Sequence, residues 1–166
     1  MPENGLPRAY DLEQRDRYLN IWVSQTAPEA NINQNDLLLN SNDITIGDLA
    51  NSIFGNSPYL SKVAIKNPQC LTRFNTHDPN EAWAVFLDTL EQEISATMYN
   101  IEALRTLLRQ RKEEVALHIA ICDLCGLWNL SDITRSLSEF ADKCVSTAIK
   151  ALLLAEAEKN NVKPSN

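Results

Sequence analysis

Three times in the middle of the chain, a residue that can cap a helix stands directly before a proline. These pairs are Ser57-Pro58, Asn67-Pro68 and Asp78-Pro79. Proline suits the first position of a helix, where its missing N–H would have no partner, and the preceding side chain satisfies another free N–H. The pairs therefore predict three successive helices, over residues 58–66, 68–73 and 79–96.

The C-terminal half of the chain shows helical spacing of apolar residues over its longest stretches. Residues 99–125 predict one long helix whose second half is apolar nearly all round, as expected of a central helix. Gly126 ends it in the manner of a left-handed C-cap, and Ser131 or Asn129 caps a last helix over residues 132–158. The sequence thus predicts an all-α fold, a helical bundle with two long C-terminal helices joined by a tight turn at Gly126.

The rest of the chain is less clearly patterned. Residues 1–7 are expected as a disordered tail, residues 8–158 as a single helical domain whose first helix ends near Ser24, and residues 159–166 as a linker or tail. Residues 30–42 are rich in asparagine and fit either a short helix or a surface connection. The only plausible β fragment is short and comprises Ile44, Thr45 and Ile46.

The acidic composition narrows the expected partners. The formal net charge is -7 and the pI is about 4.8, whereas affinity for nucleic acid depends on neutralising phosphates, so no nucleic-acid partner is expected. No apolar stretch reaches the ~18 residues that span a bilayer, and the polar N-terminus lacks the pattern of a signal peptide. The sequence therefore predicts no membrane partner and a cytoplasmic protein whose four cysteines are reduced thiols.

Catalytic motifs are absent from the sequence. It contains no glycine-rich nucleotide loop, no Walker-type lysine loop, and no metalloprotease or serine-hydrolase motif. Metal-dependent nucleotidyl transfer requires converging carboxylates, and the nearest pair, Asp43 and Asp48, has no glycine-rich loop beside it. No catalytic or cofactor-binding residue is therefore predicted.

One helical face combines potential zinc ligands. His118, Cys122 and Cys125 follow one another at i, i+4 and i+7, so three soft ligands could meet one Zn²⁺ ion. His77 or Cys144 could supply the fourth ligand. Free cysteine usually behaves as a small buried apolar side chain, so the favoured interpretation is a packed core, with a zinc site and a redox pair as the alternatives.

A basic cluster lies earlier on the same predicted helix, at Arg105, Arg109, Arg111 and Lys112. Because two glutamates follow at once, the simplest interpretation is a solvated helix face with intrahelical ion pairs. The alternative is a docking patch for an acidic partner, or for nucleotide phosphates held by a neighbouring domain. Asp123 lies inside an apolar stretch, so it is expected to be a buried, paired carboxylate that holds the turn at Gly126 or binds an arginine.

A longer pattern connects these features. Ser-Pro-x-Leu at residues 57–60 and Asn-Pro-x-x-Leu at residues 67–71 precede the basic run. An apolar Ile-Ala, Asp-Leu-x-Gly at residues 123–126 and an acidic helix with Phe-Ala-Asp at residues 140–142 follow it. In order and spacing, residues 53–154 resemble the helical stretch of glutamine synthetase adenylyltransferases, and the tryptophan after the glycine looks alphaproteobacterial. The resemblance implies structural roles for five motif residues: Ser57, Pro58, Asp123, Gly126 and Asp142.

The resemblance implies a bifunctional parent enzyme. In that family, one nucleotidyltransferase domain removes AMP from a tyrosine of glutamine synthetase and a second adds AMP from ATP, both with Mg²⁺, under the control of PII protein and glutamine. The first catalytic motif, a Gly-Lys-Leu-Gly loop and an Asp-x-Asp, should begin shortly after a segment like residues 151–166, so no catalytic residue carries over to this chain.

The chain is therefore expected to be the N-terminal helical segment of such an enzyme, inactive by itself and without its own Mg²⁺ or ATP site. It would act as a scaffold for the following nucleotidyltransferase domain, or help to dock glutamine synthetase or PII protein. The alternatives are a freestanding helical interaction protein and, more distantly, a small zinc or thiol protein.

Overall fold

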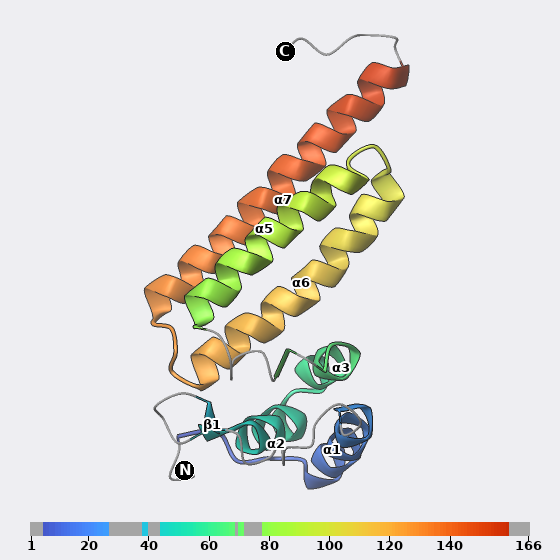
Figure 1. Ribbon diagram of the computed structural model, residues 1–166. Coiled ribbons are helices and arrows are strands. Elements are labelled where there is room, and N and C mark those ends of the chain that lie inside the picture. The colour runs from blue at the N-terminus through green and yellow to red at the C-terminus, as the bar shows by residue number, and fades with distance from the viewer. Residues whose placement is uncertain (1–4, 27–37, 40–43, 69, 72–77, 160–166) are drawn as a thin grey trace.

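The computed structural model describes residues 5–26, 38–39, 44–68, 70–71 and 78–159. Its elements are α1 (Leu12–Thr26), β1 (Leu38–Leu39), β2 (Ile44–Thr45), α2 (Ile46–Asn56), α3 (Pro58–Lys66), α5 (Pro79–Thr97), α6 (Ile101–Leu124) and α7 (Leu130–Lys159). The three long helices α5, α6 and α7 form a bundle, and α1, α2 and α3 lie below its lower end (Figure 1). The antiparallel β1–β2 pair has only two residues in each strand, so the fold is all-α, as predicted.

Two of the three predicted helix starts are confirmed by their capping side chains. At the start of α3, Ser57 Oγ accepts a hydrogen bond at 3.2 Å from a backbone N–H in the first turn. At the start of α5, the carboxylate of Asp78 accepts one at 2.8 Å. Proline follows the cap in both helices, where its missing N–H leaves nothing unsatisfied. Of the helix predicted at 68–73, the structure describes residue 68 as a turn and residues 70 and 71 as helical, while its other residues and most of residues 30–42 lie outside the described residues.

The connection from α6 to α7 is closed by backbone hydrogen bonds. Gly126 has a φ of 62°, a left-handed conformation that favours glycine because a Cβ would be crowded there. The N–H groups of Gly126 and of the next residue donate to the carbonyls of Asp123 and Cys122, at 3.1 and 2.8 Å, which is the Schellman pattern. The side chain of Asn129 then caps α7, which begins at Leu130.

Helix α2 is an element that the sequence patterns did not predict. It begins with a capping box: the N–H of Asp48 donates to Thr45 Oγ1 at 3.0 Å, and the N–H of Thr45 donates to the Asp48 carboxylate at 3.1 Å. Ile46, expected in a β fragment, is instead the first residue of the helix. Glycine and asparagine obscured the helix because both have low helix propensity, yet eight of its eleven residues are buried, so packing stabilises it.

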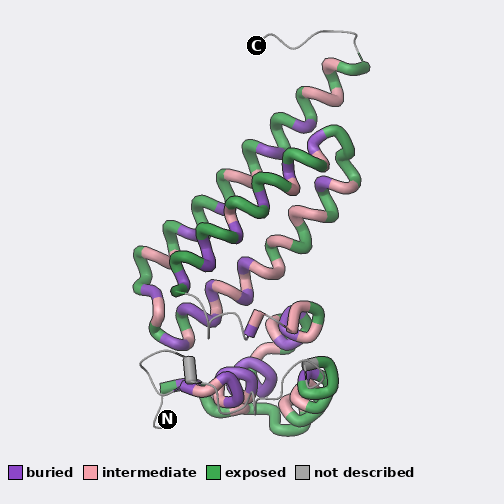
Figure 2. Tube along the Cα trace, in the orientation of Figure 1, coloured by how far each residue is buried: buried purple, intermediate pink, exposed green. Residues whose placement is uncertain are grey.

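The buried apolar side chains form one continuous cluster through both layers. Trp22 meets Phe54 edge-on in the lower layer, with ring centroids 6.4 Å apart, and Trp83 stacks on Phe86 in the bundle at 5.3 Å. Figure 2 shows buried residues along the inner sides of the bundle and over most of α2. Across the described ranges, no helix combines the length and hydropathy that would let it cross a bilayer.

An N-terminal arm crosses α2 before α1 begins. Leu6, which lies in the segment expected as a tail, is only 2% exposed. The N–H of Asp11 donates to the carbonyl of Gly55 at 2.9 Å, and Asn56 Nδ2 donates to the carbonyl of Arg8 at 2.9 Å. These bonds fix the arm to the C-terminal end of α2.

Candidate functional site

The basic cluster on α6 divides into two parts with different surroundings. Arg105, Arg109 and Lys112 are exposed and follow one another at i, i+4 and i+7, so they share one face of the helix. Arg105 pairs with Glu102 at 3.3 Å, but both side chains are more than half exposed, so this pair contributes little to stability. We call Arg105, Arg109 and Lys112 the α6 basic stripe.

Arg111 has a different role, because it links α6 to α5. Its Nε donates to Glu93 of α5 at 2.8 Å, and its Nη1 donates to Glu114 at 2.6 Å. The hydrogen bond to Glu93 is the largest cause of a raised guanidinium pKa. Glu113 pairs with Lys66 of α3 at 3.0 Å. Arg111 is therefore a cross-link within the protein, and it drops out of the set of docking candidates.

Replacing Arg111 by methionine is expected to lower the free energy of unfolding by about 1–2 kcal/mol, because Glu93 and Glu114 lose their shared cation in a partly buried setting. Arg109→Met, on the exposed face of the same helix, is the matched control and should change stability by less than about 0.5 kcal/mol. Urea unfolding followed by circular dichroism measures both variants. Equal effects would show that Arg111 does not act as the cross-link.

The helix face that carries His118, Cys122 and Cys125, the alternative zinc ligands, is packed into the protein core. Cys122 is fully buried and Cys125 is 2% exposed. The imidazole of His118 lies near the indoles of Trp83 and Trp128, with ring centroids 5.6 and 5.1 Å away. Among the residues with a described position, no three His, Cys, Asp or Glu side chains gather where they could hold a metal ion. These contacts support the core interpretation of the two cysteines.

The other acidic and histidine candidates do not assemble a site in the described parts. Asp48 is engaged in the capping box of α2, while Asp43 and His77 lie outside the described residues. Asp123 is exposed, so the expectation of a buried carboxylate is wrong. Its neighbours in sequence are apolar, but it falls on the outer side of the last turn of α6, and only its backbone carbonyl joins the turn. Asp142 is likewise exposed on α7.

The two core thiols are expected to react slowly. Burial raises the pKa of Cys125 to about 11, and burial, with a smaller contribution from Cys125, raises that of Cys122 further. Because the thiolate is the reactive form, a thiol reagent at about pH 8 should label the half-buried Cys70 and Cys144 first. Mass spectrometry of timed samples measures this order. Fast labelling of Cys122 or Cys125 would instead support the redox-pair alternative.

The same raised pKa values predict how stability changes at alkaline pH. In the folded state the buried thiols of Cys122 and Cys125 hold their protons above their ordinary pKa of 9.0. Their contribution to stability is therefore complete below about pH 9 and falls as the pH rises: the part from Cys125 is lost by about pH 11, and the part from Cys122 continues to fall above that pH. Chemical denaturation across this range, compared with a Cys122→Ala/Cys125→Ala variant, isolates the contribution.

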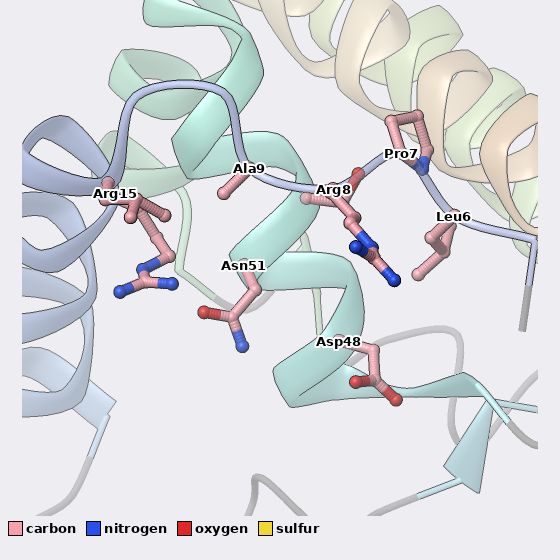
Figure 3. A pocket seen from close by; sticks show the side chains of 9 residues that line it. Leu6, Pro7, Arg8, Ala9, Arg15, Asp48 and Asn51 are labelled. Carbon is pink, nitrogen blue, oxygen red and sulfur yellow. The ribbon is translucent and has the colours of Figure 1, made fainter. Parts of the chain in front are cut away.

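An open hollow of about 300 Å³ lies where the N-terminal arm crosses α2 (Figure 3). Arg8 of the arm and Arg15 of α1 lie on either side of Asn51 of α2. Arg15 already pairs with Asp16 at 2.6 Å, and Asp48 at the rim belongs to the capping box. The hollow is therefore explained by the crossing of the arm, and its lining residues form no set suited to catalysis.

Together, these observations define a class: an all-α protein whose described residues gather no metal-binding cluster and which presents a basic helix face. Residues 48–166 match the glutamate-ammonia ligase adenylyltransferase family, and the chain belongs to that family.

The chain is similar to bifunctional glutamine synthetase adenylyltransferase/adenylyl-removing enzymes of alphaproteobacteria. One from Rhodopseudomonas palustris is 31% identical over 163 residues, which cover 96% of this chain and 16% of the relative. One from Caulobacter vibrioides is 33% identical over 117 residues, 70% of this chain and 12% of the relative. One from Brucella suis is 30% identical over 107 residues, 64% of this chain and 11% of the relative. The chain thus spans a small part of these relatives, and no solved structure matches it significantly.

Proposed function

We propose that this chain is the N-terminal helical segment of a cytoplasmic enzyme that adenylylates and deadenylylates glutamine synthetase, and that it serves there as a scaffold and docking part. The match of residues 48–166 to the family carries the proposal. The small share of each relative that the chain covers supports its role as one part of a larger protein. The motifs at residues 57–60 and 123–126 cap α3 and end α6, as a framework role requires.

On this proposal, the adenylyl chemistry belongs to the nucleotidyltransferase domain that follows. Mg²⁺ and ATP would bind in that domain, where carboxylates can converge on the metal. The chain alone would transfer no nucleotide. Its contribution would be to hold the following domain in place and to help bring the substrate protein to it.

A chimera tests the scaffold role. The matched segment of the Rhodopseudomonas palustris relative is replaced by residues 1–166 of this chain, and AMP transfer to glutamine synthetase and AMP removal from it are both measured. The chimera should carry out both reactions, and the isolated chain neither. A folded chimera without activity, or activity in the isolated chain, would contradict the proposal. A reading frame that continues beyond codon 166 into Gly-Lys-Leu-Gly and Asp-x-Asp would support it independently.

The α6 basic stripe is the part of the segment that we propose for docking glutamine synthetase. In the chimera, Arg109→Glu with Lys112→Glu should weaken binding of glutamine synthetase by about tenfold or more, and the loss should shrink at high salt because exposed charges are screened. Lys62→Glu with Lys150→Glu is the matched control, since both lysines are exposed outside the stripe and the change in net charge is the same.

The outcome of this test distinguishes the two candidate partners. Binding of glutamine synthetase is measured by titration, and binding of PII protein in parallel. If the substitutions weaken only the binding of PII protein, the α6 basic stripe is the docking surface for PII protein and not for glutamine synthetase. Unchanged binding of both partners would rule out a docking role for the stripe.

A further inference from the structure

Beyond its first residue, Leu130, helix α7 carries five large apolar side chains that the rest of the described protein leaves exposed. Their exposed fractions range from 47% to 66%. They are Leu137 (47%), Val145 (59%), Ile149 (54%), Leu152 (61%) and Leu153 (66%). We call these five residues the α7 apolar stripe.

The α7 apolar stripe is a second apolar face, distinct from the one that packs in the bundle. Its members recur at helical spacing and therefore lie on one side of α7. Residues on another side, including Phe140, Thr147 and Ala151, are buried. The small Ala141 and Ala148 are also exposed on this side of α7, and small residues between large ones leave gaps into which the side chains of a second helix can pack.

The last turns of α7 extend beyond the bundle. In Figure 1, α7 continues well past the turn that joins α5 to α6, so its last turns have no bundle partner beside them. Single exposed apolar residues are common on protein surfaces. Four of the five stripe residues fall between Val145 and Leu153, and large apolar side chains gathered on one side of a helix indicate an interaction surface.

We infer that the α7 apolar stripe is the seat for an apolar-faced helix of the domain that follows this segment in the complete enzyme. The inference rests on the proposed function. The relatives contain far more chain than this segment, which covers 12% and 16% of two of them, and the family match runs through α7 to residue 166. On the proposed function, α7 is the described helix nearest in sequence to that domain.

Two physical arguments favour this occupant over others. A domain attached to α7 has a high effective concentration at the stripe, so it competes well against a separate molecule or a second copy of the chain. The stripe also consists of uncharged side chains, whereas the α6 basic stripe offers charge. A charged partner such as an acidic protein surface therefore fits α6, and an apolar internal contact fits α7.

Thiol labelling at introduced cysteines tests the inference. Ile149→Cys and Leu152→Cys report on the stripe, and Gln110→Cys, exposed on α6, is the matched control. Each variant is made in the isolated chain and in the Rhodopseudomonas palustris chimera, and the labelling rate is measured by mass spectrometry. In the isolated chain all three should label quickly. In the chimera the two stripe cysteines should label at least about tenfold more slowly, because labelling then requires local opening, while Gln110→Cys should be unchanged.

The results separate this inference from the proposed function. Stripe cysteines that label as quickly as the control in an active chimera would overturn the inference and leave the proposed function standing. Protected stripe cysteines in an inactive chimera would contradict the proposed function instead. Protection in the isolated chain that grows with protein concentration would assign the stripe to a second copy, and would also overturn the inference.

Discussion

Replacing Leu117 by alanine is expected to lower the free energy of unfolding by about 2–5 kcal/mol. Leu117 is fully buried in α6, the helix that contacts α5, α7 and α3. Because α6 is held by contacts with three other helices, its surroundings can collapse only in part, so the removed atoms leave a cavity as well as a loss of apolar burial. Urea unfolding should show a lower midpoint with an unchanged slope, because the surface exposed on unfolding stays nearly the same.

Leu152→Ala is the matched control for this prediction. It makes the same chemical change on a neighbouring helix, at a side chain that is 61% exposed. The isolated chain should lose less than about 0.5 kcal/mol, since little apolar contact is removed. A loss as large as that of Leu117→Ala would show that the α7 apolar stripe is already buried in the isolated chain.

Helix ends were the most predictable part of the fold, because they depend on neighbouring residues. Ser57 and Asp78 cap the helices that begin at the prolines after them, and Gly126 takes the left-handed conformation at the end of α6. The side chains of Ser57 and Asp78 each accept a hydrogen bond from a backbone N–H only a few residues away. The missing side chain of Gly126 permits the backbone conformation in which the end of α6 is hydrogen-bonded. Such features can be inferred without any knowledge of the tertiary structure.

Helix α2 could not be inferred from periodicity alone, because tertiary packing supplies most of its stability. Its Phe54 contacts Trp22 of α1, and its last turn binds the N-terminal arm. One local signal was available, the capping box formed by Thr45 and Asp48 ahead of an apolar run. This capping box is a local feature that indicates where the helix starts.

The candidate site shows a similar limit. Arg109 and Arg111 are two residues apart, but such a step turns a helix by more than half a circle, so the two side chains face different surroundings. The sequence is enough to show that Arg109 and Arg111 lie on different faces of α6. It does not show that Glu93, eighteen residues away, binds Arg111 across the α5–α6 contact. Which charges remain available for a partner is therefore decided by tertiary structure.

Replacing Gly55 by alanine is expected to lower the free energy of unfolding by about 2–4 kcal/mol. A Cβ at this position would lie 2.2 Å from the Cβ of Ala9 and 2.7 Å from its Cα, so the arm would have to move away from α2. The move would strain the hydrogen bonds from Tyr10 and Asp11 to the Gly55 carbonyl and expose Leu6, and these costs add to the overpacking itself. Thermal or urea unfolding measures the loss.

Helix propensity alone predicts the opposite sign, because alanine stabilises a helix interior by about 0.5–1 kcal/mol relative to glycine. A more stable Gly55→Ala variant would therefore show that the arm does not pack against α2. The double variant Gly55→Ala/Ala9→Gly locates the clash: it removes the contact at 2.2 Å but keeps the one at 2.7 Å, so it should recover part of the lost stability. A coupling energy of about 1 kcal/mol or more between positions 55 and 9 is expected of residues in direct contact. If the effects of the two substitutions are simply additive, the loss of stability in Gly55→Ala does not come from its contact with Ala9.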